Sequence, residues 1–346
     1  MTAGKPVLLD VEGLVVEFKG PRQRGSLKHA VVHAVDGVSL TIQHGETLGI
    51  VGESGSGKST TARAILRLVP AVSGSMKFEG VDVASAKAGD RRELLARVQM
   101  VFQDPFGSLN ARMKVGDGIR EPLDIHRVGD GASRRRRVAE LLDLVGLPPD
   151  AVDRYPHEFS GGQRQRIGIA RALAVDPALV ICDEPVAALD VSIQAQILKL
   201  LKDLQRRIGM AYLFIAHDLN VVRHMAHRTA VMYLGAIVEE GPSEALFQAP
   251  RHPYTRALVS AIPTADPDTE GSRVLLHGEI PSPTDPPTGC RFRTRCPYAQ
   301  ERCAVETPQL QAARDDVNVA CHFWRQIDDA ESEQPSYPEG NPLRQS

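Results

Sequence analysis

The residues of this sequence that are best suited to chemistry form one glycine-rich string. It reads Gly52, Glu53, Ser54, Gly55, Ser56, Gly57, Lys58, Ser59 and Thr60 and matches the pattern G-x-x-x-x-G-K-[ST]. Glycines let backbone N–H groups converge on phosphate oxygens, and a helix N-terminus adds partial positive charge. In such a string Lys58 reaches the β- and γ-phosphates and the Ser59 hydroxyl binds Mg²⁺. The string follows a strand-like run and opens a helical one, so it predicts a site for a nucleoside triphosphate with Mg²⁺.

Two carboxylates follow the apolar run at residues 179–182. A buried strand there would deliver Asp183 to its C-terminal edge, where the carboxylate can join the shell of a Mg²⁺ ion. Glu184 would point to the other side and can orient or deprotonate an attacking water. The alternative is an acidic pair in solvent, but the glycine-rich string favours the hydrolytic interpretation.

A second candidate anion site lies at Ser160, Gly161, Gly162 and Gln163, just before a helical stretch at residues 167–174. A serine and two glycines at a helix N-terminus offer a hydroxyl and backbone N–H groups as donors. One domain rarely needs two phosphate sites, so we predict that this one serves the nucleotide of another copy. The alternative is an ordinary helix N-cap with a flexible approach.

Short β-rich runs alternating with helical patterns must position these residues. Runs at Thr47–Val51, Leu179–Asp183 and residues 212–217 predict a largely parallel sheet covered by helices, an α/β fold. One helix is marked by apolar residues at three- and four-residue spacing from Ile193 to Ile208, with Gly209 as its C-terminal cap.

Composition narrows the class of protein. The chain has 346 residues and a net charge of −2, which does not favour a nucleic-acid partner. The arginine run at residues 134–137 is typical of a solvated helix face. No apolar run is long enough to span a bilayer, and the start lacks the layout of a secretory signal. We therefore predict a cytoplasmic protein, for which any membrane role must come through a partner.

The motifs, in their order along the chain, resemble those of ATP-binding cassette (ABC) ATPases. The resemblance rests on the string from Gly52, the string from Ser160, the run at 179–185, Ala188-Leu189-Asp190 and Ile215-Ala216-His217-Asp218. It implies a P-loop NTPase core with a parallel or mixed sheet and a helical subdomain at about residues 104–176. We predict a nucleotide-binding domain over residues 1–250, a small Cys-rich C-terminal domain over 251–326 and a disordered polar tail over 327–346.

The resemblance also implies roles for single residues. Gln103 corresponds to the glutamine that senses Mg²⁺ and water and contacts the membrane subunit, and His217 to the histidine at the γ-phosphate. Asp190 corresponds to an aspartate that crosses the dimer interface, while the Ser160 string contacts the ATP of the opposite protomer. Phe18 is the candidate for stacking on adenine, with His33 or a purely structural phenylalanine as alternatives.

Two further stretches, residues 104–113 and 250–263, resemble the peptide/nickel branch of bacterial importers, specifically the oligopeptide and dipeptide permease ATPases. Residues 104–110 and 184–196 resemble the second ATPase subunit of such systems more than the first. The resemblance implies a head-to-tail dimer with a second ABC ATPase subunit, two transmembrane permease subunits and an extracytoplasmic substrate-binding protein. It places the chain at the cytoplasmic face of the bacterial inner membrane, powering peptide import. The alternatives are nickel or another small solute as cargo, a soluble ABC ATPase, and a redox-sensing regulator.

Four cysteines gather near the C-terminus, at Cys290, Cys296, Cys303 and Cys321. In a cytoplasmic chain such a set suits a Cys₄ metal site better than disulfides. Their spacing matches neither zinc ribbons nor ferredoxins. The resemblance implies a [4Fe–4S] cluster, with Zn²⁺ or unmetallated thiols as alternatives. The fifth cysteine, Cys182, is predicted to be a small core residue.

Overall fold

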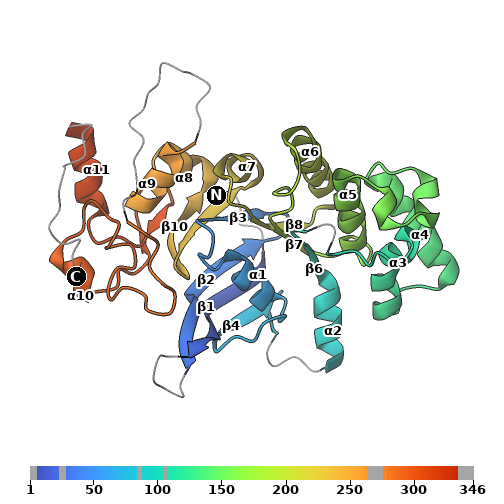
Figure 1. Cartoon of the computed structure of the whole chain (residues 1–346), viewed down its shortest axis with the longest axis horizontal. Coiled ribbons are helices and arrows are strands. Elements are labelled where there is room, and N and C mark those ends of the chain that lie inside the picture. The colour runs from blue at the N-terminus through green and yellow to red at the C-terminus, as the bar shows by residue number, and fades with distance from the viewer. Residues whose placement is uncertain are drawn as a thin grey trace. The chain divides into compact units, whose positions relative to one another are not determined.

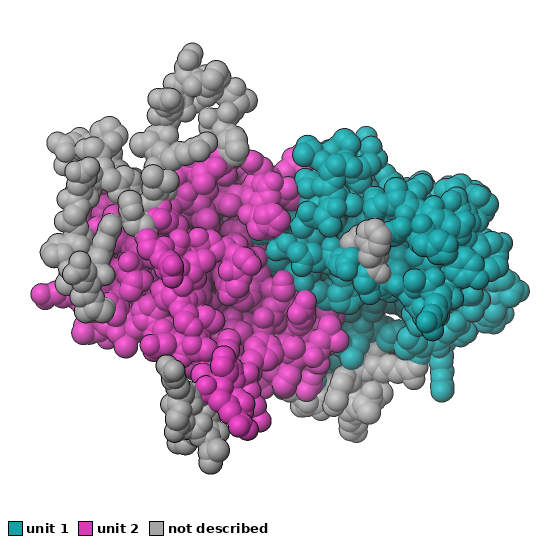
Figure 2. Space-filling model, in the orientation of Figure 1, with its two compact units in different colours: residues 1–11, 40–47, 75–216 teal, residues 12–39, 48–74, 217–346 magenta. Residues whose placement is uncertain are grey.

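The chain forms two compact units, each built from several separate segments (Figure 2). The computed structural model describes residues 6–22, 29–83, 88–104, 107–262, 276 and 278–333. Unit 1 consists of residues 1–11, 40–47 and 75–216, and unit 2 of residues 12–39, 48–74 and 217–346. This division differs from the predicted boundary at residue 250, because the glycine-rich string shares its unit with the whole C-terminal part of the chain.

The sheet of unit 1 has three parallel strands in the order β8-β7-β6. These are β6 (Val98–Val101), β7 (Leu179–Asp183) and β8 (Ala211–Ile215). All residues of β7 and β8 are buried, as expected for strands of a parallel sheet covered on both faces. The predicted strand at β7 is confirmed, and β8 ends at Ile215 rather than at residue 217.

Among the helices of unit 1, α3, α4 and α5 pack against one another (green in Figure 1). The elements are α2 (Ala88–Arg97), α3 (Val115–His126), α4 (Gly131–Leu144), the 3₁₀ turns η1 (Pro149–Asp153) and η2 (Pro156–Glu158), α5 (Gly161–Ala172) and α6 (Val191–Ile208). The predicted end of α6 is confirmed, since Gly209 caps it in the left-handed conformation with φ 81°. None of the helices in the described part of the chain is long and apolar enough to cross a bilayer.

Unit 2 contains neighbouring strands in the order β11-β12-β10-β9-β3. They are β3 (Thr47–Val51, whose first residue belongs to unit 1), β9 (Arg228–Tyr233), β10 (Ala236–Pro242), β11 (Gln311–Ala312) and β12 (Asn318–Val319). Strand β3, confirmed over its predicted range, pairs in parallel with β9, whereas β9 and β10 form an antiparallel hairpin. Leu234 and Gly235 make its two-residue turn, both with positive φ, as tight hairpins require.

A second sheet has the strand order β2-β1-β4-β5. Its strands are β1 (Val7–Arg22), β2 (His29–Gln43), β4 (Ser73–Phe78) and β5 (Val81–Asp82). Within the stretch at residues 20–33, β1 extends to Arg22 and β2 begins at His29. The centre of that stretch, residues 23–28, lies outside the described residues.

The C-terminal part of unit 2 is held by partly buried ion pairs as well as by apolar packing. The helices of unit 2 as a whole are α1 (Lys58–Ile65), α7 (Leu219–Met225), α8 (Ser243–Gln248), α9 (Pro253–Ser260), α10 (Glu301–Val305) and α11 (Trp324–Glu333). Asp328 on α11 pairs with Arg251 at 2.5 Å and also with Arg256. Helix α11 therefore includes the start of the predicted disordered tail, and residues 334–346 lie outside the described residues.

Candidate nucleotide-binding site

The glycine-rich string of unit 2 adopts a loop conformation that only glycine supports at two of its positions. Gly52 has φ 153° and Gly57 has φ 105°. A Cβ on Gly52 would lie 2.1 Å from the Met232 carbonyl oxygen, and one on Gly57 would lie 2.3 Å from the Ala34 carbonyl oxygen. At Gly52 and Gly57 the backbone of the loop therefore packs directly on the backbone of Met232 and Ala34, which leaves no room for a side chain at either glycine.

Lys58 is folded back over this loop, although it opens helix α1. Its Nζ donates hydrogen bonds to the carbonyl oxygens of Gly52 and Glu53, both at 2.8 Å, and the side chain is only 5% exposed. Gly57 precedes α1 without a side-chain cap, so the backbone N–H groups of the first turn, including those of Ser59 and Thr60, face no capping side chain. Such a helix start, with a lysine beside it, suits phosphate oxygens.

The two carboxylates in unit 1 lie at the end of β7, as the sequence predicts. Asp183 is the last residue of the strand and only 2% exposed. Glu184 follows with φ 46°, a left-handed conformation that is strained for this residue type, and its N–H donates to the Ile215 carbonyl oxygen at 2.9 Å. Backbone strain of this kind concentrates at functional positions, which makes Glu184 a candidate catalytic group.

Gln103 and Glu184 are brought together although they are far apart in the sequence. Gln103 follows β6, the strand next to β7, and its Nε2 donates to Glu184 Oε2 at 2.9 Å. Gln103 is exposed and Glu184 is half-buried, so the pair stands at the surface of unit 1. An amide and a carboxylate held side by side can orient a water molecule for attack.

The Ser160 string begins helix α5 with a reciprocal capping box. The Ser160 hydroxyl accepts from the Gln163 N–H at 3.3 Å, and Gln163 Oε1 accepts from the Ser160 N–H at 2.9 Å. Gly161 is the first helical residue, and a Cβ on Gly162 would lie 2.4 Å from Ile193 Cγ2. The N-cap role considered for Ser160 is thus present, and Gly162 is needed for close packing on α6.

Asp190 is the N-cap of α6 and is exposed. Its Oδ1 accepts from the Ile193 N–H at 3.0 Å and from the Ser192 hydroxyl at 2.8 Å. These hydrogen bonds, the one from Ile193 first, lower the pKa of Asp190. The carboxylate is therefore charged at neutral pH and remains at the surface of unit 1.

The other two candidates belong to unit 2. His217 is exposed and directly precedes Asp218, the N-cap of α7. Phe18 lies on β1 with 40% of its surface exposed, so its ring is available for stacking. His33, the alternative to Phe18, has its Nδ1 3.1 Å from a Glu17 carboxylate oxygen.

The residues predicted for the site belong to different units. Unit 2 holds the glycine-rich string, His217 and Phe18, whereas unit 1 holds Gln103, the two carboxylates, the Ser160 string and Asp190. Within unit 2 the structure brings Lys58 into contact with the glycine-rich loop. Within unit 1 it brings Gln103 into contact with Glu184.

The four C-terminal cysteines lie within electrostatic range of one another. Burial, and to a smaller extent the neighbouring thiols, raises the pKa of Cys290 to about 12 and that of Cys321 to about 11. The Cys290 N–H donates to the Cys303 carbonyl oxygen at 2.8 Å. Nevertheless, among the residues that the structure describes, no group of three or more His, Cys, Asp or Glu could hold a metal ion. The predicted iron–sulfur or zinc centre is therefore not supported by this arrangement. The buried core position predicted for Cys182 is confirmed.

Sequence reasoning missed the residues that hold the glycine-rich string from the C-terminal part of unit 2. Arg295 binds the Glu53 carboxylate with both terminal nitrogens, at 2.7 and 3.1 Å, and the Tyr254 hydroxyl accepts from the Glu53 N–H at 2.8 Å. Nothing in the spacing of the sequence relates residues so far apart. The only signal was that a charged residue, Glu53, stands inside a phosphate-binding string.

Comparisons with known proteins agree on the family. The ABC transporter family matches residues 35–187, and the family of the oligopeptide/dipeptide transporter C-terminal region matches residues 238–303. The chain is 51% identical over 318 residues to the oligopeptide transport ATP-binding protein OppF of Escherichia coli, covering 90% of this chain and 95% of OppF. It is 50% identical over 314 residues to a putative peptide import ATP-binding protein of Brucella ovis, covering 91% of this chain and 97% of that protein.

Solved structures support the same fold. The dimeric ATP-binding cassette MJ0796, bound to ADP and Pi after hydrolysis, matches with a TM-score of 0.60 and 28% identity, over 68% of this chain and 99% of that one. The protein cbiO1 of Clostridium perfringens, part of an ABC transporter complex, matches with a TM-score of 0.60 and 26% identity, over 70% of this chain and 92% of that one. With the glycine-rich loop, the carboxylates after β7 and these similarities together, the chain belongs to the ATP-binding proteins of ABC transporters, in their oligopeptide/dipeptide branch.

Proposed function

We propose that this chain binds and hydrolyses ATP and thereby powers the import of peptides through a membrane permease. The proposed hydrolysis of ATP is supported by the contact between Gln103 and Glu184 at the end of a buried strand. The peptide part rests on relatives about 50% identical that are named for peptide import and oligopeptide transport. Nickel or another small solute is the alternative cargo, since an ATPase subunit of this kind does not itself bind the cargo.

In this proposal the loop from Gly52 to Thr60 binds the phosphates of ATP. The Lys58 ammonium exchanges the carbonyl oxygens it now contacts for β- and γ-phosphate oxygens, and the first N–H groups of α1 add further donors. Ser59, Asp183 and Gln103 would hold Mg²⁺, which offsets charge on the transferred phosphoryl group. Glu184 accepts the proton of the attacking water while Gln103 holds the carboxylate in place.

The remaining motif residues serve the contacts between subunits and with the rest of the nucleotide. The Ser160 string would bind the ATP held by the opposite protomer, His217 the γ-phosphate, and Phe18 the adenine ring. Asp190 would cross the dimer interface, where its exposed, charged carboxylate can meet the partner.

The partners that complete this function are a second ABC ATPase subunit, in a head-to-tail dimer, and two transmembrane permease subunits. A substrate-binding protein on the outer side supplies the peptide. No nucleic acid takes part. The chain would lie at the cytoplasmic face of the bacterial inner membrane as a peripheral subunit.

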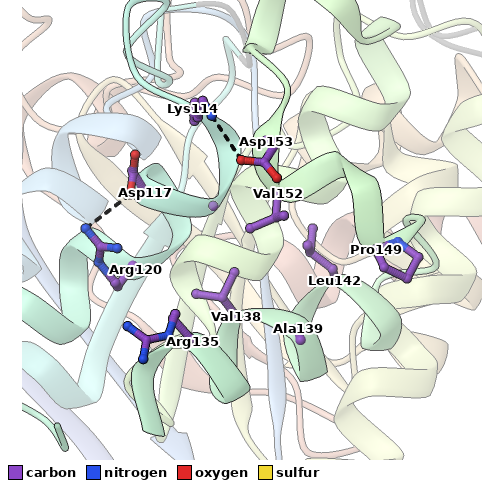
Figure 3. Close-up of a pocket in the computed structure, with 11 residues that line it drawn as sticks. Lys114, Asp117, Arg120, Arg135, Val138, Ala139, Leu142, Pro149, Val152 and Asp153 are labelled. Atoms are coloured by element: carbon purple, nitrogen blue, oxygen red, sulfur yellow. Dashed lines mark hydrogen bonds and ion pairs between the residues drawn. The ribbon is translucent and has the colours of Figure 1, made fainter. Parts of the chain in front are cut away.

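A pocket in unit 1 offers a docking site for the permease (Figure 3). It has a volume of about 450 Å³ and lies among α3, α4 and η1. Apolar side chains of Val138, Leu142 and Val152 line it, and charged residues surround them (Figure 3). The first residue that lines the pocket, Lys114, follows Gln103 by eleven positions, so an occupant would contact the segment of chain that leads from the candidate catalytic glutamine.

The charges around this pocket indicate which kind of permease segment it would bind. Lys114 pairs with Asp153 at 3.0 Å, and Arg120 pairs with Asp117 at 3.1 Å, as the dashed lines in Figure 3 mark. Arg135, in contrast, forms no ion pair with any residue that the structure describes. An amphipathic cytoplasmic segment of the permease, with apolar side chains and one acidic residue, complements this pocket.

Affinity purification from detergent-solubilised membranes of the native host tests the proposed function. The chain is expected to be recovered with two multi-span proteins and a second cassette subunit, and Arg135→Glu is expected to lower their recovery about tenfold through like-charge repulsion. The matched control is Arg136→Glu, on the same helix but outside the pocket, which should leave recovery unchanged. Recovery with soluble proteins alone would contradict the transport function, and equal recovery of both variants would contradict the docking site.

The [4Fe–4S] cluster at the four cysteines, with Zn²⁺ as the alternative, stays a prediction from the family resemblance, as does the small Cys-rich C-terminal domain. Protein purified anaerobically is expected to contain stoichiometric iron and to show charge-transfer absorbance if the thiols close around a cluster. Zinc without iron would favour the alternative metal. Absence of both metals would leave four free thiols, those of Cys296 and Cys303 buried and those of Cys290 and Cys321 half-buried, which is how the structure describes these residues.

A further inference from the structure

Glu53 is the residue through which the C-terminal part of unit 2 reaches the phosphate-binding loop. Its carboxylate receives two hydrogen bonds from Arg295, at 2.7 and 3.1 Å, in the bidentate geometry that gives the strongest pairing. Arg295 is only 6% exposed, so the pair is largely shielded from solvent on the arginine side. Its guanidinium also lies 5.8 Å from the centre of the Tyr233 ring, which restricts the position of the cation.

The backbone of Glu53 is held as firmly as its side chain. The Glu53 N–H donates to the hydroxyl of Tyr254 at 2.8 Å, and Tyr254 is fully buried. The Tyr254 ring packs against Tyr233 and Phe292, with ring centres 4.8 and 5.5 Å apart. Burial raises the pKa of Tyr254, so its hydroxyl stays neutral at any physiological pH.

The third polar group of Glu53, its carbonyl oxygen, contacts the lysine of the loop. The Glu53 carbonyl oxygen accepts from Lys58 Nζ at 2.8 Å. Arg295, Tyr254 and Lys58 therefore meet on one residue, from its side chain, its N–H and its carbonyl. A shift of Glu53 would move the carbonyl oxygen that binds Lys58 Nζ, and it would change the direction in which the loop N–H groups point.

The other end of the loop is supported from the same region. The Gly235 N–H donates to the Ser56 carbonyl oxygen at 2.9 Å, and the Asp36 N–H donates to the Gly235 carbonyl oxygen at 2.8 Å. Arg291 joins these two strands because it donates to the Asp36 carboxylate and to the Leu234 carbonyl oxygen. The loop is thus supported at Glu53 and at Ser56 by residues that belong to or contact the Cys-rich segment.

We propose that Arg295 and Tyr254 are positioning residues that hold Glu53, and with it the phosphate-binding loop, in the conformation that accepts ATP. The C-terminal part of the chain thereby sets the affinity for ATP. The inference rests on the proposed role of the loop from Gly52 to Thr60. Neither residue contacts the phosphates in this proposal, so their effect falls on binding rather than on the hydrolytic step.

Equilibrium binding of a fluorescent ATP analogue to the full-length chain tests this inference. Arg295→Ala is expected to raise the Kd about tenfold, because it removes a shielded bidentate contact, and Arg295→Lys should fall between it and wild type. Tyr254→Phe keeps the packed ring and loses only the hydroxyl, so it should raise the Kd about threefold without loss of folding. In the assembled transporter these variants should raise the KM for ATP and leave kcat within about twofold of wild type.

Two comparisons separate positioning from a general structural effect. In a Glu53→Ala background Arg295→Ala should add nothing, since it acts on the carboxylate, whereas Tyr254→Phe should retain its effect, since it acts on the backbone N–H. Arg302→Ala, which removes an exposed pair with Glu306 in the same region, should bind ATP like wild type. An unchanged Kd in Arg295→Ala, or an Arg295 effect that persists without Glu53, would overturn the proposal. Unimpaired ATP binding by Lys58→Ala would instead overturn the assignment of the loop itself.

Discussion

Glu184→Gln is expected to lower ATP turnover by about 10²- to 10⁴-fold, the usual contribution of a general base. Glutamine keeps the size of the side chain and an oxygen that can still accept from Gln103 Nε2. It cannot take a proton from the attacking water, so hydrolysis loses its general base while the contact is preserved. ATP binding should be unchanged, because the phosphate-binding loop lies elsewhere in the chain, and the ATP-bound dimer should accumulate.

Steady-state phosphate release and ATP binding, measured on the complex with its partner subunit, check this result. The matched control is Glu301→Gln, an exposed glutamate in the first turn of α10, which should turn over ATP like wild type. If Glu184→Gln hydrolysed ATP at the wild-type rate, Glu184 would not be the base. A parallel loss of ATP binding would point to a folding defect at the strained position after β7.

Lys58→Ala is expected to weaken ATP binding about 10- to 100-fold, and hydrolysis falls with it at limiting ATP. Hydrogen bonds to a charged group are worth roughly 1.5–3 kcal/mol, and Lys58 has the only ammonium in the glycine-rich string. The variant also leaves the Gly52 and Glu53 carbonyl oxygens without this donor. The loop should therefore lose both its main cation for the phosphates and part of its internal support.

Isothermal titration of the full-length chain with ATP and Mg²⁺ measures this loss directly. Lys199→Ala, an exposed lysine on α6, is the control and should bind ATP with the wild-type Kd. Lys58→Arg adds a second comparison, because it keeps the charge but not the compact ammonium that fits between two carbonyl oxygens. Wild-type affinity in Lys58→Ala would show that the nucleotide binds somewhere other than this loop.

The sequence by itself determined those features whose cause is local. A phosphate-binding loop needs glycines and a lysine at fixed spacing just before a helix, so the string from Gly52 is recognisable from its residue types and their spacing alone. Strand β7 and the capped end of α6 are equally predictable, because apolar runs, three- and four-residue spacing and a left-handed glycine act over a few residues.

Only the tertiary structure decided which distant residues meet. Gln103 reaches Glu184 across 81 positions because β6 and β7 are neighbouring parallel strands, and Arg295 reaches Glu53 across 242 positions because the C-terminal segment packs on the loop. The cysteines show the reverse case: four suitable residue types in a short segment predicted a metal site, yet their side chains form no metal-holding group in the part of the chain that the structure describes. Composition specifies which chemistry is available, whereas ligation and positioning depend on distances of a few ångströms that only packing sets.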